Sequence, residues 1–282
     1  MLHVDCDTLR TSAIGQWLLS EMDKPVAQAK FAALQMMFNF DPRKQLHGLT
    51  LYSSGKTPED GVLLVYADFD ADRLVTLAKA AKEYQSTTYK QHVIHNWLDD
   101  KKEAKHGIKP RVFAAIQGGH IVVFGQQEVR VAQALDVLDR AAPNLAASGV
   151  FPQLGVSDSG SLVQAAARKL ELPDSDPNAA LFRLSKMARL QVGESAGQLR
   201  ATLSLEAGDE DVARQMATVG QGLVALMKLQ KDNPGSAKLA SALSLKQDGT
   251  SVVVSLAVPT AEAIDFAKAD AARKAQKQAE KE

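Results

Sequence analysis

The stretch "QGGHIVVFG", from Gln117 to Gly125, has a counterpart in "QDGTSVVVS", from Gln247 to Ser255. In each, two turn residues separate strand-like runs: Gly118-Gly119 in the first and Asp248-Gly249 in the second. Such dipeptides predict β-hairpins with two-residue type I′ turns. Apolar residues at helical spacing follow both hairpins. The repetition predicts a unit of strand, strand and helix that the chain contains twice.

The likeness extends to earlier segments of each half. Residues 48–69 and 187–207 both read as two strands, and each pair precedes a helix with acidic residues in its first turn, which the helix dipole favours. Residues 2–22 read as a strand followed by a helix, and residues 150–170 are expected to match them, with a helix from Leu162. The apolar side chains of residues 31–40 fall at helical spacing, and we expect them to pack in the core.

These patterns predict an α+β fold made of two tandem copies of a mostly antiparallel sheet with helices packed on one face. We expect the joint between the copies in residues 140–149, where Pro143 lies among small residues. The first repeat then spans residues 1–145 and the second spans residues 146–282. The second repeat ends in a polar tail that is rich in helix-forming residues.

The composition limits the classes of partner. A chain of 282 residues with 45% hydrophobic and 23% charged residues is typical of a globular protein. Lys and Arg total 33 and Asp and Glu total 33, so no overall positive field attracts nucleic acid, and we predict none as a partner. No apolar run approaches the about 18 residues of a membrane-spanning helix. The single Cys6 excludes an internal disulfide framework, and the carboxylates beside it disfavour a reactive thiolate.

Five residues are candidate metal ligands. In "HVDCD", the side chains of His3, Asp5 and Asp7 share one face if the segment is a strand, and imidazole and carboxylate groups bind divalent cations. In "HVIH", His92 and His95 are a second candidate pair, but the segment around them is strand-like, which places the two rings on opposite faces. The competing interpretation is a polar outer face in the first case and ordinary surface histidines in the second.

The motifs of several familiar enzymes are absent. The segment Gly155–Ser161, "GVSDSGS", does not match GxSxG, and its Ser and Asp residues suit a helix cap better than a nucleophile. No phosphate-binding loop, GxGxxG or HExxH pattern occurs. Residues 68–79 begin like an EF-hand loop, but Arg73 and Lys79 stand where that loop needs Gly and Glu, so we interpret Asp70 as a helix N-cap. We predict no cofactor and favour a protein that is not an enzyme.

Three segments carry a resemblance to a group of proteins: "VDCDTLRTSAIGQWLL", "FNFDPRKQLHGLTLYSSG" and "LVYADFDADRL". Together they resemble uncharacterised exported bacterial α+β proteins with an internal duplication, over roughly residues 2–140. The resemblance implies a periplasmic or extracellular protein, and it brings no established activity, cofactor or catalytic residue. The strand-like alternation that begins directly after Met1 also predicts that a leader has been removed, with a cytoplasmic protein as the alternative.

The expected function is that of a non-catalytic exported or cell-envelope module, either for binding or structural. Its partner would be a protein, a glycan or a second copy, bound through sheet edges or through a cleft between the repeats. One alternative is a metal-dependent enzyme that uses the five candidate residues. The other is a small-molecule-binding protein with an apolar pocket between the repeats.

Overall fold

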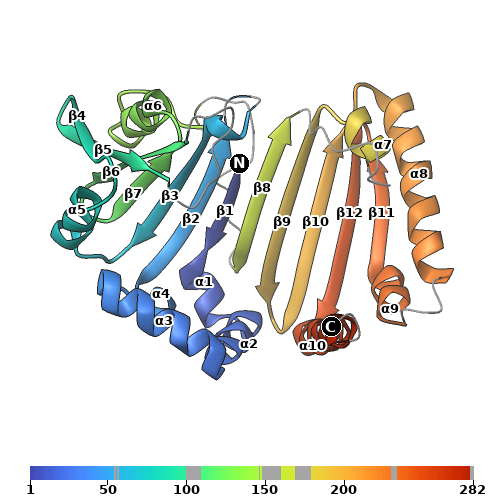
Figure 1. Ribbon diagram of the computed structural model, residues 1–282. Coiled ribbons are helices and arrows are strands. Elements are labelled where there is room, and N and C mark those ends of the chain that lie inside the picture. The colour runs from blue at the N-terminus through green and yellow to red at the C-terminus, as the bar shows by residue number, and fades with distance from the viewer. Residues whose placement is uncertain are drawn as a thin grey trace. The chain divides into compact units, whose positions relative to one another are not determined.

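A computed structural model describes residues 1–53, 55, 57–99, 109–145, 147, 160–168, 179–229 and 234–279 (Figure 1). Contacts between Cα atoms divide the chain into two compact units. Unit 1 comprises Met1–Arg10 and Leu18–Ser157, and unit 2 comprises Thr11–Trp17 and Asp158–Glu282. The predicted boundary at residues 145 and 146 stays a prediction, because residue 146 lies outside the described residues.

The first half of the chain forms the elements β1 (Leu2–Asp5), α1 (Cys6–Thr11), α2 (Ala13–Met22), α3 (Pro25–Phe38), α4 (Pro42–Gln45), β2 (Leu46–Ser53), the 3₁₀ turn Pro58–Asp60, β3 (Gly61–Ala67), α5 (Ala71–Lys79), β4 (Gln85–Tyr89), β5 (His92–Leu98), β6 (Arg111–Gln117), β7 (Ile121–Gly125) and α6 (Glu128–Leu138). The strands of unit 1 follow the order β1-β2-β3-β7-β6-β5-β4, and every pair is antiparallel.

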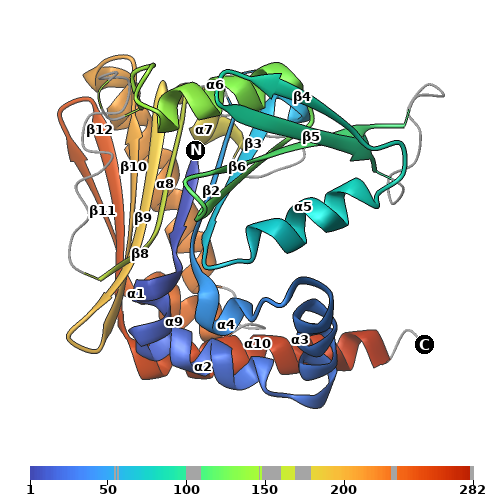
Figure 2. The ribbon, with the colours of Figure 1, turned by 90° about the vertical axis from the view of Figure 1, so that its left-hand side faces the viewer.

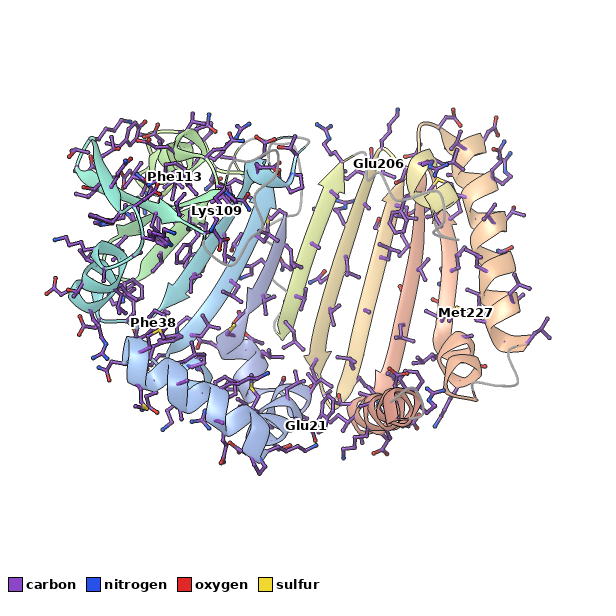
Figure 3. All side chains as sticks on the ribbon, in the orientation of Figure 1. Glu21, Phe38, Lys109, Phe113, Glu206 and Met227 are labelled. Carbon is purple, nitrogen blue, oxygen red and sulfur yellow. The ribbon has the colours of Figure 1, made fainter. Side chains whose placement is uncertain are left out.

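The core of unit 1 lies between this sheet and α6. Helix α6 contacts β3, β5, β6 and β7. Its Val131 and Leu135 are 0% exposed and meet Ile94 of β5 and Val123 of β7, which are also 0% exposed. Phe113, labelled in Figure 3, packs against the same cluster. The antiparallel register places Ile94, Ala115 and Val123 in one row across three strands, so alternate residues of each strand supply the core.

The second half forms β8 (Ser161–Arg168), α7 (Ala179–Leu184), β9 (Met187–Ser195), β10 (Gln198–Glu206), α8 (Glu210–Leu229), α9 (Pro234–Ala242), β11 (Leu243–Asp248), β12 (Ser251–Pro259) and α10 (Thr260–Ala279). The strands of unit 2 follow the order β8-β9-β10-β12-β11, again with antiparallel pairs. Met216 of α8 packs on Leu205 and Val252, which lie on neighbouring strands. Glu194 of β9 accepts hydrogen bonds from the backbone N–H groups of Ala13 and Ile14, at the start of α2.

The two units share one topology. The order β1-β2-β3-β7-β6 in unit 1 matches β8-β9-β10-β12-β11 in unit 2 strand for strand, when each set is counted along the chain. The predicted α+β class with two tandem antiparallel copies is therefore confirmed. The halves differ in what lies between matching strands. Between the middle helix and the last hairpin, the first half carries the added β4–β5 hairpin, whereas the second carries the helix α9. Between the first and second strands, the first half carries α1 to α4, whereas the described residues of the second carry α7. In Figure 2 the β4–β5 hairpin extends the sheet of unit 1 beyond β6.

The predicted hairpins are present, and the predicted positive φ at both central turn residues is found in the first hairpin but not in the second. Gln117 pairs with Ile121, so the first loop has three residues, and its Gly118 and Gly119 have φ values of +60° and +77°. In the second hairpin Asp248 pairs with Ser251, which shifts the turn to Gly249-Thr250. Only Gly249 in this pair has a positive φ, so the turn is not of type I′.

Two further expectations were wrong. The segment from Leu162 is the strand β8 rather than a helix, because pairing with β9 and burial of Leu162 and Ala166 outweigh the helix propensity of its alanines. The "GVSDSGS" segment thus ends on the first residue of a strand, Ser161, and its first five residues lie outside the described residues. The expected core residues Met36 and Met37 of α3 are 80% and 54% exposed, because α3 is apolar around most of its circumference and only part of it is covered.

Candidate functional site

Hydrogen bonds and ion pairs join the tip of the β4–β5 hairpin to the C-terminal end of α6. The Tyr89 hydroxyl donates to Oδ2 of Asp136 at 2.9 Å, and Nζ of Lys90 donates to Oδ1 of the same carboxylate at 2.5 Å. Nε2 of His92 lies 2.6 Å from Oδ2 of Asp139. The His92 and Asp139 side chains are only 10% and 17% exposed. These contacts join Lys90 of the hairpin turn, and Tyr89 and His92 on either side of the turn, to the end of α6.

Asp139 accepts two further hydrogen bonds, one of them from Gln117 of the segment Gln117–Gly125. Nε2 of Gln117 donates to Oδ1 of Asp139 at 3.3 Å, and Nε2 of Gln91 donates to Oδ2 at 2.5 Å. The hydrogen bond from His92 is the main cause that holds the pKa of Asp139 below its usual value, and the hydrogen bond from Lys90 does the same for the pKa of Asp136. Both carboxylates are therefore ionised at neutral pH and are engaged by donors of the hairpin.

The base of the hairpin is fastened by a second set of contacts. The Tyr84 hydroxyl lies 2.8 Å from Nδ1 of His95, whose ring is 9% exposed and stacks on Tyr84. Burial, followed by the charge of Lys79, lowers the pKa of His95, so this ring is neutral at pH 7. Arg111 donates from Nε to Oδ1 of Asn96 at 2.8 Å and from Nη2 to the Glu83 carbonyl oxygen at 2.6 Å. Both ends of the hairpin are thus held against the rest of unit 1.

A separate polar cluster gathers at the ends of β1, β2 and β3. Nδ1 of His47 lies 3.0 Å from both carboxylate oxygens of Asp7, and its Nε2 lies 3.0 Å from Oδ2 of Asp68. Arg10 donates to Oδ1 of Asp7 at 2.8 Å, and Nδ1 of His120 lies 3.5 Å from Oδ1 of Asp68. Hydrogen bonds to Asp68 and then to Asp7 raise the pKa of His47. With a carboxylate at each ring nitrogen, the imidazolium form is stabilised and neither nitrogen has a lone pair available for a metal ion.

The structure separates the predicted metal candidates. His3 directs Nδ1 to the Thr50 hydroxyl at 2.8 Å, and Asp5 accepts a hydrogen bond from the backbone N–H of Thr8 at 2.8 Å. The strand β1 ends at Asp5, so the expectation that Asp7 continues its face was wrong: Asp7 lies in the first turn of α1. Asp5 immediately precedes this helix, and its side chain accepts from a backbone N–H in the first turn, which sequence alternation alone does not reveal.

The second candidate pair is also divided. His92 binds Asp139 and His95 binds Tyr84, and two residues between them put the rings on opposite faces of β5, as predicted for a strand. Among the described residues, no group of three or more His, Cys, Asp and Glu side chains is arranged to hold a metal ion. The partners His47 and Asp139 were not singled out from the sequence, because each lies some 40 residues or more from its partner along the chain.

An apolar groove crosses the face of unit 1 opposite its core. Leu51, Leu63 and Phe124 lie in one row of the register, on β2, β3 and β7. With Val112 of β6 they line a groove of about 250 Å³ that is open to solvent. Its polar lining includes Arg111, which already donates to Asn96. Asp99 and Gln126 also line the groove, so its lining is mainly apolar with three polar or charged side chains.

The outermost strand of unit 1 is β4, and one of its two edges is free of any described strand. Its five residues, Gln85–Tyr89, pair one for one with residues of β5 without a bulge. The first four are exposed, and Tyr89 is partly buried by its contact with the core. The strand "QSTTY" contains no charged residue and no proline. Unpaired N–H and C=O groups on such an edge are the groups with which another strand pairs.

Comparisons with known proteins give a likeness of fold. No family model and no curated protein matches the chain. Among solved structures, crystal form III of a protein named TP0453 has a TM-score of 0.45 and 9% identity, with 94% of this chain and 93% of that chain covered. Crystal form I has a TM-score of 0.43 and 10% identity, with 95% and 92% covered. Among the described helices, none is both long enough and apolar enough to cross a membrane.

Proposed function

We propose that the protein is a non-catalytic binding module that acts outside the cytoplasm, in a bacterial envelope. In this proposal, unit 1 binds an extended polypeptide segment as an additional strand along the free edge of β4. The observation that carries the proposal is the exposed and uncharged strand Gln85–Tyr89 at the end of the strand order. Main-chain hydrogen bonds would supply affinity, and alternate side chains of β4 would supply selectivity.

The sequence and the pairing of β4 support this use because the strand carries no charge, proline or bulge, three of the devices that usually protect an edge strand. Natural sheets protect free edges with inward-pointing charges, proline, bulges or a covering helix. The five pairs between β4 and β5 are continuous, and Gln85, Ser86, Thr87 and Thr88 are exposed. Thr and Tyr favour strands, so the segment is predisposed to keep its extended form without a partner.

The fastening of the hairpin supports the proposal as well. Asp136 and Asp139 hold the turn of the hairpin, while Arg111 and His95 hold its base. A strand that is held at both ends loses little conformational freedom when a partner pairs with it, and this reduces the entropic cost of binding. Because these polar side chains bind one another, we propose that they position β4 for binding and do not act in catalysis.

The location outside the cytoplasm is supported by the sequence resemblance to exported bacterial proteins. It is tested by fractionation of cells that express the complete open reading frame with a C-terminal tag. We expect the protein in the periplasmic or surface fraction. Recovery in the cytoplasmic fraction alone would contradict this part of the proposal.

Binding is tested with a displayed library of random ten-residue peptides selected on the purified protein. We expect enriched peptides to lose at least about tenfold in affinity for Thr87→Pro, because proline removes a main-chain donor and its ring obstructs the edge. The matched control is Ser244→Pro in β11, the strand at the end of the order in unit 2. Failure to enrich any peptide, or equal affinity for wild type and Thr87→Pro, would refute the proposal.

A further inference from the structure

We infer that the partner of β4 is a second copy of this chain, paired antiparallel about a two-fold axis that passes beside Thr87. This inference rests on the proposed function of the β4 edge and adds the identity of the strand that it binds. Thr87 is the central residue of the five-residue strand. An axis at this position pairs all five residues of one copy with all five residues of the other, which no other register achieves.

The pairs that this axis creates are compatible with one another. Thr87 lies opposite its own equivalent, Ser86 lies opposite Thr88 of the partner subunit, and Gln85 lies opposite Tyr89 of the partner subunit. Threonine and serine pairs across antiparallel strands are favourable through their hydroxyl groups. No charge occurs in the strand, so the pairing brings no like charges face to face within it.

The residues that flank β4 favour antiparallel over parallel pairing. Glu83 precedes the strand and Lys90 follows it, with side chains 58% and 48% exposed. Antiparallel pairing about Thr87 brings the end with Glu83 toward the end with Lys90 of the partner subunit. Parallel pairing would place each charge beside its own equivalent, including Lys82, which precedes Glu83. Both charges also have a partner within their own chain, Arg111 for Glu83 and Asp136 for Lys90. The charges at the ends therefore favour the two-fold arrangement over the parallel one without fixing it.

An exposed apolar residue lies beside the same edge. Val93 of β5 is 45% exposed and is the register partner of Thr88. The two-fold axis would place Ser86 of the partner subunit on the far side of Thr88, in the same row and on the same face. That serine would lie about 9–10 Å from Val93, with Thr88 between them, so it extends the row without covering Val93 and the main-chain hydrogen bonds supply most of the contact.

The strength of this contact follows from its size. Two strands of five residues bury less surface than the about 1,200 Å² at the lower limit of stable interfaces. We therefore expect a reversible dimer with a dissociation constant on the order of 10 µM rather than a permanent one. The population of the dimer should rise with protein concentration.

Variants with opposite charges at residue 87 test the two-fold axis. Recovery of the dimer when the two variants are mixed would show that both are folded. Thr87→Lys and Thr87→Glu each place two like charges face to face in the dimer, whereas an equimolar mixture pairs opposite charges. Sedimentation equilibrium of the 30.3 kDa chain is measured for wild type, for each variant and for the mixture. We expect at least a tenfold weaker dimer for each variant alone and recovery in the mixture. Val129→Lys, on the exposed surface of α6, is the control and should dimerise as wild type does.

Two results would overturn the inference. One is a wild-type chain that stays monomeric up to about 500 µM, well above the expected dissociation constant. The other is a dimer that neither charged variant weakens, or that the mixture fails to restore. If wild type is monomeric but the selected peptides still lose affinity for Thr87→Pro, the inference about the partner fails while the proposed function of the edge stands. If no peptide depends on β4 either, both fail.

Discussion

The β4–β5 hairpin is packed on the core of unit 1 through one fully buried side chain, Ile94. Shortening this side chain tests whether the hairpin shares that core. Ile94 of β5 is 0% exposed and lies in the core cluster with Val123 and Leu135. Its register partners are Thr87 on one side and Ala115 on the other. Because Thr87 is exposed and Ala115 is small, neither neighbour can fill the space that a truncation leaves. We therefore expect Ile94→Ala to cost about 3–5 kcal/mol of unfolding free energy, the upper part of the usual range, and Ile94→Val about 1 kcal/mol.

The measurement is urea denaturation followed by far-UV circular dichroism, with Val93→Ala as the matched control. Val93 is the preceding residue on the same strand, but its side chain is 45% exposed and faces away from the core. Its truncation should change the unfolding free energy by no more than about 0.5 kcal/mol. If Ile94→Ala costs no more than Val93→Ala, the hairpin does not share the core of unit 1, and the argument that β4 is held in a binding-ready form fails.

Three further predictions concern the polar groups. His47 has a raised pKa in the folded state, so its stabilising contribution is fully present below its unfolded pKa of about 6.5 and is lost as the pH rises through the folded pKa. His47→Gln should therefore lower the unfolding free energy more at pH 6 than at pH 9, and an equal loss at both values would contradict this. Asp70 accepts a hydrogen bond from the N–H of Arg73 at 3.0 Å, so Asp70→Ala should cost about 1 kcal/mol in urea denaturation while Asp70→Asn should be nearly neutral. Burial is the main cause that raises the pKa of Cys6; the charge of Arg10 opposes it, and the carboxylates of Asp5 and Asp7 add to it. Iodoacetamide should accordingly alkylate this thiol more slowly than free cysteine at pH 7.5, and a faster reaction would refute the assignment.

Much of the fold follows from local patterns in the sequence. The repeated hairpins, the acidic helix starts and the N-cap at Asp70 are determined by residues that are close along the chain, and the structure confirms them. The strand β8 could not be predicted from local sequence patterns. The alanines of residues 165–167 favour a helix in isolation, and only pairing with β9 makes them a strand. The turn of the first hairpin gained a residue because pairing begins at Gln117 and Ile121, a register that the dipeptide Gly118-Gly119 does not determine.

The polar clusters were less predictable than the fold. His92 and His95 were identified, and their separation onto two faces of β5 follows from strand alternation. Their partners could not be named, because Asp139 meets His92 only after α6 has packed on the sheet. Likewise, the sequence predicts Asp7 as a metal ligand beside His3 and Asp5, whereas its pairing with His47 depends on where β1 ends and α1 begins. Contacts of this kind are set by tertiary packing rather than by spacing along the chain.

The account is tested most directly by a disulfide cross-link at the two-fold axis. Thr87→Cys is prepared with Cys6→Ser, which leaves one cysteine per chain. In the proposed antiparallel pair the two Thr87 Cα atoms are about 4.5–5.5 Å apart, which a disulfide spans. We predict that mild oxidation gives a covalent dimer for Thr87→Cys and much less for Gln85→Cys or Tyr89→Cys, whose equivalents lie at opposite ends of the pair. Equal cross-linking at all three positions, or none at residue 87, would contradict pairing through β4.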